Sequence, residues 1–146
     1  MRKSSAVVVD ASACVILVIG GSLADPIDRL WRGWLQDGTK LFAPSLWSYE
    51  ITSALHRLFM QKVLNEERAE SALEAALNLG VETVVPDTDF CRKAFTWATK
   101  LNHLASYDGS YLALAEALGV PIWTADKRLV NRSRQIGIDW VRWVGA

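Results

Sequence analysis

Short apolar runs alternate along this chain with longer segments whose apolar residues recur at helical spacing. The runs are Ala6–Val9, "KLFAPS" (40–45), "VETVVP" (81–86), "VPIWTA" (120–125) and "IDWVRWV" (138–144). Strands that alternate with helices form a parallel sheet, because each helical crossover returns the chain to the same end of the sheet. The sequence therefore predicts a three-layer α/β/α fold with a central, mainly parallel sheet covered by helices on both faces.

The segments between these runs have helical periodicity and recognisable ends. Gly20 and Gly21 close the first, and Ser45, with Pro44 before it, is predicted to cap the third. The 146 residues favour one domain spanning 1–146, and the seven tryptophans fall at positions typical of core packing. The predicted helices are 11–19, 26–37, 46–62, 66–79, 88–102, 108–118 and 126–137.

The charged residues argue against one class of function and indicate one candidate surface for phosphate binding. Sixteen basic and sixteen acidic residues give zero net charge, which argues against a protein that coats nucleic acid by bulk charge. The basic residues gather in 127–142, where Arg128, Arg132 and Arg134 are candidates for phosphate contact. A solvated helix face explains any one of them equally well.

Cysteines and histidines offer no zinc site. Cys14 and Cys91 stand among apolar residues without metal-ligand spacing, so we expect two reduced core residues in a cytoplasmic protein. His56 and His103 are isolated, and we interpret each as a surface or packing residue.

The first 25 residues resemble a secretory signal, with a basic start, an apolar middle and small residues at the end. Asp10 opposes that interpretation, because a charge within the apolar stretch disfavours membrane insertion. No other segment is long enough to span a bilayer. We therefore expect a soluble protein with no membrane association.

Four carboxylates stand where such a fold gathers ligands. Asp10 and Asp126 each follow a predicted strand, and open α/β sheets bind ligands beyond the carboxyl ends of their strands. Asp108 and Glu50 lie near helix N-termini. Taken singly each acid has an ordinary explanation, which is a helix cap for Asp108 and an exposed surface residue for Glu50.

Four carboxylates in one cleft would repel one another and raise their own pKa values unless a divalent cation lay among them. Oxygen ligands suit Mg²⁺ or Mn²⁺. Asp10, Asp108 and Asp126 are the predicted metal ligands, and any of the four acids is a candidate to accept a proton from an attacking water. Ser12 and Thr124 are predicted to orient these acids through their hydroxyls.

Three stretches carry a resemblance to a known family: "VVVDASA", "APSLWSYEITSAL" and "SYDGSYLALAEALGVPIWTADKRL". In this order and spacing they resemble the PIN-domain family and, within it, VapC-type toxins of toxin–antitoxin pairs. The last stretch is the most specific, and the resemblance covers essentially the whole chain. Gly109 departs from the family pattern, in which Ala or another small residue follows the third acid, and we expect it to loosen the helix start.

The resemblance implies a Mg²⁺- or Mn²⁺-dependent endoribonuclease. It places the four acids of the family pocket on Asp10, Glu50, Asp108 and Asp126, and the hydroxyl of the last motif on Thr124. It also implies an RNA substrate, a homodimer and a cognate antitoxin whose C-terminal segment lies across the active-site cleft. The basic candidates Arg128, Arg132 and Arg134 would then contact RNA.

Other functions stay open. A catalytically inactive PIN-like domain could bind RNA or protein, although retention of all four acids argues against it. A phosphoacceptor domain also gathers aspartates around Mg²⁺, but the strand "VETVVP" lacks an acceptor aspartate at its end. A haloacid-dehalogenase-type phosphatase is disfavoured because Asp10-Ala11-Ser12 lacks the second aspartate of that site.

Overall fold

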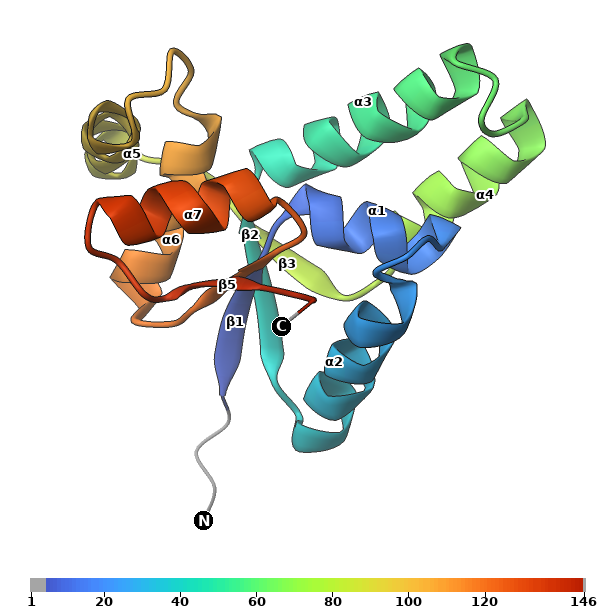
Figure 1. Cartoon of the computed structure of the whole chain (residues 1–146), viewed down its shortest axis with the longest axis horizontal. Helices are drawn as coiled ribbons and strands as arrows, with labels where there is room; N and C mark the ends of the chain where they lie inside the picture. Colours follow the sequence, from blue (N-terminus) through green and yellow to red (C-terminus); the bar gives the residue numbers. More distant parts are fainter. Residues whose placement is uncertain (1–4, 146) are drawn as a thin grey trace.

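A five-stranded parallel sheet forms the centre of the computed structural model, which describes residues 5–145 (Figure 1). Its spatial order is β3-β2-β1-β4-β5, and every neighbouring pair is parallel. The strands are β1 (Ala6–Val9), β2 (Lys40–Pro44), β3 (Val81–Val84), β4 (Ile122–Thr124) and β5 (Val141–Trp143). The central β1 is buried, with Val8 and Val9 at 0% exposure, because helices cover both of its faces.

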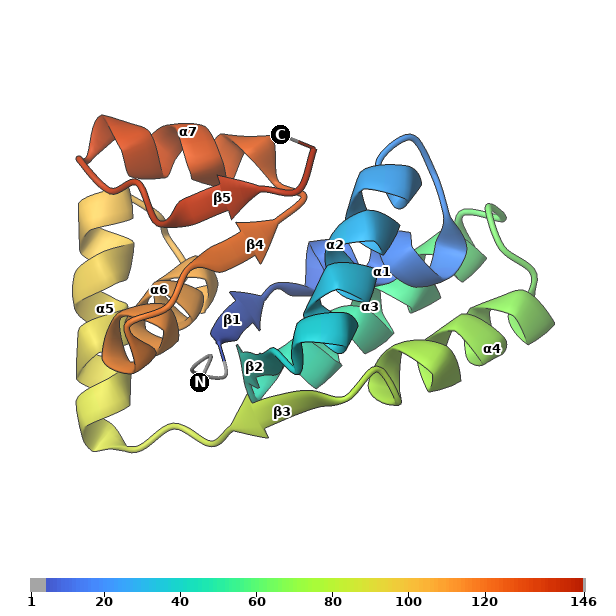
Figure 2. The same ribbon diagram turned by 90° about the horizontal axis from the view of Figure 1, so that it is seen from below.

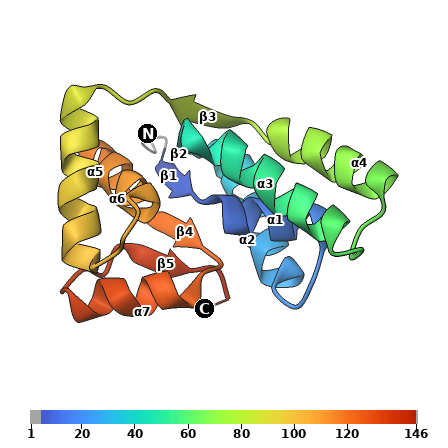
Figure 3. The same cartoon turned by 90° about the horizontal axis from the view of Figure 1, so that it is seen from above.

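Seven helices surround the sheet. They are α1 (Ala11–Ile19), α2 (Ala24–Asp37), α3 (Leu46–Met60), α4 (Glu66–Leu77), α5 (Thr88–Leu101), α6 (Tyr107–Leu118) and α7 (Lys127–Gln135). Seen along the strands, α5 and α6 lie on one side of the sheet and α1 to α4 on the other (Figure 3). The view from below shows the same division, with α7 beside the edge strand β5 (Figure 2). The predicted three-layer fold is confirmed.

The predicted elements appear within two residues of their expected ends, except that the last strand, expected over 138–144, is Val141–Trp143. Ser45 occupies the predicted N-cap position of α3, but its side chain makes no capping hydrogen bond: its backbone is already helical, and its carbonyl accepts a hydrogen bond from Ser48 Oγ at 3.2 Å. Helix α2 begins at Ala24, so that Pro26 occupies its first turn, where a missing N–H costs nothing.

All seven tryptophans lie in the hydrophobic core or pack against it, whereas only one of the two cysteines is buried. Trp31, Trp47 and Trp97 are buried, and the other four tryptophans pack against the same core, as predicted. Cys14 is a free, fully buried thiol whose pKa is raised to about 12 by burial. The prediction of a core position for Cys91 is wrong, because this free thiol is exposed on α5.

Gly109 fixes how α6 meets α5. A Cβ atom at this position would lie 2.3 Å from the Ala94 carbonyl oxygen, so only glycine permits the observed backbone approach. The expected loosening of the helix start does not occur, because α6 is regular from Tyr107 onward. This contact places the first turn of α6, with Asp108, beside the carboxyl ends of β1 and β4.

Among residues 5–145 no single helix has the length and apolar character needed to span a membrane. Helices α1 and α2 have the required length and apolar character only when taken together, and the chain bends by 106° between them.

Candidate active site

Asp10 lies at the carboxyl end of β1 and is held by three donors. Val9 pairs with Trp123 across the sheet, which brings the following residues, Asp10 and Thr124, side by side. Asp10 Oδ1 accepts hydrogen bonds from Ser12 Oγ at 2.6 Å and from the Ala13 N–H at 3.1 Å, while Oδ2 accepts one from Thr124 Oγ1. The side chain therefore caps α1 and has little freedom to move, since Asp10 is only 8% exposed.

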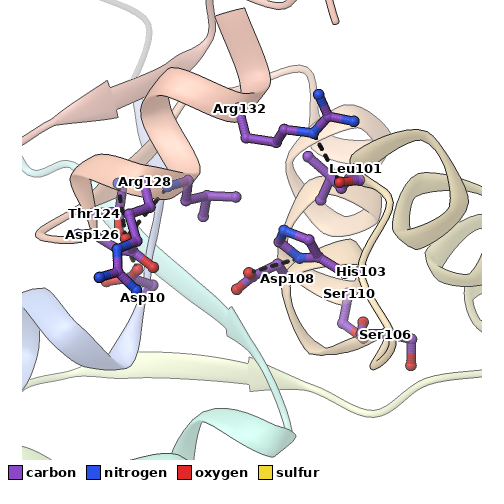
Figure 4. A network of polar contacts seen from close by, with 11 residues as sticks. Asp10, Leu101, His103, Ser106, Asp108, Ser110, Thr124, Asp126, Arg128 and Arg132 are labelled. Carbon is purple, nitrogen blue, oxygen red and sulfur yellow. Dashed lines mark hydrogen bonds and ion pairs between the residues drawn. The ribbon is translucent and has the colours of Figure 1, made fainter. Parts of the chain in front are cut away.

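Asp126 caps α7 at the end of the neighbouring strand. Its Oδ1 accepts hydrogen bonds from the N–H groups of Arg128 and Leu129, at 3.0 and 3.3 Å. The Asp126 N–H in turn donates to Thr124 Oγ1 at 2.9 Å, so one buried hydroxyl joins both aspartates. Ser12 Oγ completes the connection by accepting from the Ala125 N–H at 3.1 Å. Figure 4 shows Asp10, Thr124 and Asp126 side by side.

Glu50 approaches from α3 and contacts α6. Tyr111 Oη, which belongs to a side chain only 2% exposed, donates a hydrogen bond to Glu50 Oε1 at 2.7 Å. Sequence reasoning did not identify Tyr111 as a site residue. The available signal was its position one helical turn after Asp108, on the same face of α6.

Asp108 is turned toward a histidine. His103 Nδ1 lies 3.2 Å from Asp108 Oδ2, and each side chain is 34% exposed (Figure 4). The interpretation of His103 as isolated is wrong, because the turn after α5 brings it back to the start of α6. The ordinary explanation of Asp108 as a helix cap does not hold: among the four acids, the side chains that accept helix N–H groups belong to Asp10 and Asp126.

The charges of the four acids act on one another. Burial raises the pKa of Asp10 from 3.8 to about 6, against the lowering effect of its hydrogen bonds, and the charge of Asp108 raises it further. Burial likewise raises the pKa of Glu50, to which the charges of Asp10 and Asp108 contribute. The pKa of Asp108 is raised by burial and by Asp126, and lowered by His103. Negative charge is therefore costly here.

The donor chemistry of the site suits a hard cation, although the side chains are not gathered around one point. All four candidate ligands are carboxylates, the oxygen donors that Mg²⁺ and Mn²⁺ prefer. Within the described part of the chain, no three Asp, Glu, His or Cys side chains approach closely enough to bind one ion together. Asp108 contacts His103 and reaches toward the side of the site where Asp10 and Asp126 lie (Figure 4).

The basic candidates on α7 have different surroundings. Arg132 Nε donates to the Leu101 carbonyl oxygen at 2.9 Å, and its Nη1 donates to Gln135 Oε1 at 3.0 Å, so this side chain ties α7 to the end of α5. Arg128 and Arg134 are exposed. The preceding Lys127 lies over the Trp143 ring, 4.2 Å from its centroid.

Two openings adjoin the acids. A groove of about 1060 Å³ runs between α1 and α3, with Ser12, Tyr49, Glu50 and Tyr107 among the residues that line it. A smaller cavity of about 440 Å³ is lined by Glu50, His103, Tyr107 and Asp108, among others. Glu50 and Tyr107 belong to both, so the two openings meet beside the carboxylates.

Acids at two strand ends and two helix starts of a parallel α/β domain define a class of fold and site. Comparison with known proteins assigns the chain to a family with this fold. The model of the PIN domain family matches residues 7–134. The chain is 36% identical over 122 residues to "Ribonuclease VapC1" of Mycobacterium tuberculosis, covering 84% of this chain and 86% of that protein. "Ribonuclease VapC12" of the same organism is 29% identical over 125 residues, covering 86% and 90%.

Solved structures show the same fold. M. tuberculosis VapC20, described as a sarcin-ricin loop cleaving toxin, superposes with a TM-score of 0.67 at 18% identity and covers 93% of this chain and 98% of its own. VapBC2 of Rickettsia felis, bound to a promoter DNA fragment, gives 0.68 at 13% identity, covering 94% and 98%. This chain belongs to the PIN domain family.

Proposed function

We propose that this protein is an endoribonuclease and the toxin of a toxin–antitoxin pair, and that it hydrolyses RNA phosphodiester bonds with a carboxylate-held Mg²⁺ or Mn²⁺. The observation that carries the proposal is the convergence of Asp10, Glu50, Asp108 and Asp126 on one region, where burial and the charges of neighbouring acids raise the pKa values of Asp10, Glu50 and Asp108. The relatives named as ribonucleases supply the substrate class.

Asp10, Asp108 and Asp126 would hold the ion. When bound, it lowers the pKa of a water molecule and stabilises charge on the leaving oxygen. Ser12 and Thr124 keep the Asp10 carboxylate in one orientation. His103 contacts Asp108 and so controls the direction in which that carboxylate points.

Glu50 is our assignment for the residue that accepts the proton of the attacking water. Its pKa is raised, which brings the carboxylate closer to the basicity that proton transfer at neutral pH requires. The hydrogen bond from Tyr111 fixes Oε1 and stabilises the charged form. Glu50 also borders both openings, where a substrate phosphate would enter.

The groove between α1 and α3 suits a protein partner along most of its length. Its sides include Val15, Ile16, Ile19, Leu46 and Leu58, whose apolar side chains favour an amphipathic segment. An antitoxin segment seated there would end beside Glu50 and block RNA. Co-expression with the neighbouring gene product tests this partner, and light scattering tests the homodimer that we also propose.

Cleavage of a pool of structured RNAs tests the nuclease activity. Purified protein is incubated with Mg²⁺, Mn²⁺ or EDTA beside Asp108→Asn, and Asp139→Asn, an exposed acid just before β5, serves as the matched control. We expect metal-dependent cutting that Asp108→Asn loses and Asp139→Asn keeps. Full activity in Asp108→Asn would contradict the carboxylate mechanism.

One observation favours a second candidate, an inactive PIN-like module that binds RNA or protein. Asp108 is paired with His103, and among residues 5–145 no three acids are close enough to bind one ion, as a domain without metal would show. Absence of cleavage with every metal, from folded protein free of antitoxin, would favour the module.

A further inference from the structure

Two exposed tyrosines stand directly before two of the acids. Tyr49 precedes Glu50 at the start of α3 and is 76% exposed, and Tyr107 precedes Asp108 at the start of α6 and is 62% exposed. Both line the groove beside Glu50, although they come from helices on opposite sides of the sheet. The site is thus flanked by two aromatic rings that the hydrophobic core does not use.

The position of these rings along the groove separates them from its apolar part. Helices α1 and α3 both begin at the carboxyl ends of the strands, so Ser12, Tyr49 and Glu50 lie at the end of the groove nearest the acids. The residues Ile19 and Leu58 lie toward the other ends of the two helices. Tyr107 also lines the smaller cavity with His103 and Asp108, so it stands where the two openings meet.

Charge makes aromatic contacts valuable at this place. The chain has zero net charge, and the four acids repel RNA phosphates, so electrostatic attraction offers little affinity at the site. Stacking of bases on aromatic rings is independent of charge, because every base has a π-face. The bases of a duplex are already stacked on one another, whereas unpaired bases are free to stack on side chains.

We propose that Tyr49 and Tyr107 form a stacking platform that binds unpaired RNA bases next to the phosphodiester at the carboxylates. The proposal deepens the proposed nuclease function and rests on it for the identity of the ligand. It restricts the substrate to RNA whose bases beside the cleaved bond are unpaired. Neither ring takes part in proton transfer or metal binding.

Binding in EDTA tests the platform without cleavage. Fluorescence anisotropy with a labelled, single-stranded oligoribonucleotide pool compares the unmodified protein with Tyr49→Ala, Tyr107→Ala and the double variant Tyr49→Phe/Tyr107→Phe. Phe95→Ala is the matched control, because Phe95 is 73% exposed on the outer helix α5. Circular dichroism confirms that each variant is folded, as exposed positions allow.

We expect each alanine variant to weaken binding on the order of tenfold, whereas the double phenylalanine variant and Phe95→Ala stay within about twofold. A duplex of the same strands should bind weakly and respond to none of the variants. Unchanged single-strand binding in both alanine variants, or no binding by the unmodified protein, overturns the proposal.

Two further results separate possible causes. Loss of binding in the phenylalanine variant equal to that in the alanine variants would show that the hydroxyls act by hydrogen bonding, which also overturns stacking. Alanine variants that bind RNA normally but fail to retain a co-expressed antitoxin would identify a protein-docking surface instead. Intact RNA binding together with absent metal-dependent cleavage would contradict the nuclease function while leaving the platform standing.

Discussion

The two halves of the site are held in different ways. On the strand side, Asp10 and Asp126 cap helices and accept hydrogen bonds from backbone N–H groups, and Thr124 bonds to both residues. On the helix side, Glu50 contacts Tyr111 and Asp108 contacts His103, each through one side-chain bond. The backbone of the fold therefore orients the strand-side acids, whereas the helix-side acids depend on side chains that can turn.

The largest effect on stability is expected from Asp10→Asn on the strand side. Because burial raises the Asp10 pKa from 3.8 to about 6, the folded state keeps a proton between these pH values that the unfolded chain has released. The contribution of Asp10 to stability is therefore full below about pH 4 and falls as the pH rises through 6.

Asp10→Asn removes the ionisable group, and with it the loss of stability as the pH rises. In EDTA at neutral pH we expect the variant to be more stable than the unmodified protein, by about 3 kcal/mol at most. Urea unfolding followed across pH 4 to 8 measures the difference. Equal stability of the two proteins at every pH would show that the charged Asp10 carboxylate is not destabilising.

Thr124→Val tests the hydroxyl that joins the strand-side acids. The substitution preserves shape but leaves Asp10 Oδ2 without its donor and the Asp126 N–H without its acceptor. Because Thr124 is fully buried, we expect a loss of about 2 kcal/mol in the free energy of unfolding. Thr124→Ser retains the hydroxyl and should lose less; an equal loss would assign the effect to the methyl group.

Tyr111→Phe is the corresponding change on the helix side. It removes the one hydrogen bond to Glu50 Oε1, and we expect a smaller loss, about 1 kcal/mol. The pKa of Glu50 should rise, since that bond lowers it. Carboxyl NMR titration measures the pKa, and an unchanged value would remove Tyr111 from the site.

The smallest effect is expected from His103→Ala. The contact with Asp108 is partly exposed, so its loss should change the free energy of unfolding by no more than about 0.5 kcal/mol. His56→Ala, an exposed histidine on α3, is the control. A loss as large as that of Thr124→Val would mean that the helix side is held as firmly as the strand side.

Sequence patterns predicted the strand side better than the helix side. The run Ala6–Val9 followed by Asp10, and "IWTAD" ending at Asp126, place acids at strand ends through a periodicity visible in the chain. The parallel register then decides their contacts with Ser12 and Thr124. The fold was predictable for the same reason, because strands and helices alternate throughout.

The contacts of the helix side depend on packing between distant elements. Tyr111 meets Glu50 across 61 positions of sequence, and no local pattern indicates that pairing. His103 reaches Asp108 because Gly109 lets α6 approach α5 and the turn between them folds back. The capping of α1 and α7 by Asp10 and Asp126 was missed because those residues were considered only as ends of strands.

A calorimetric titration with Mn²⁺ at neutral pH tests most directly whether acids from both halves bind one divalent ion. The unmodified protein is compared with Asp10→Asn, Asp108→Asn and the control Asp139→Asn. The account predicts binding that each of the first two variants weakens by tenfold or more and that the control preserves. Binding that persists unchanged in Asp108→Asn, or no binding by the unmodified protein, would contradict it.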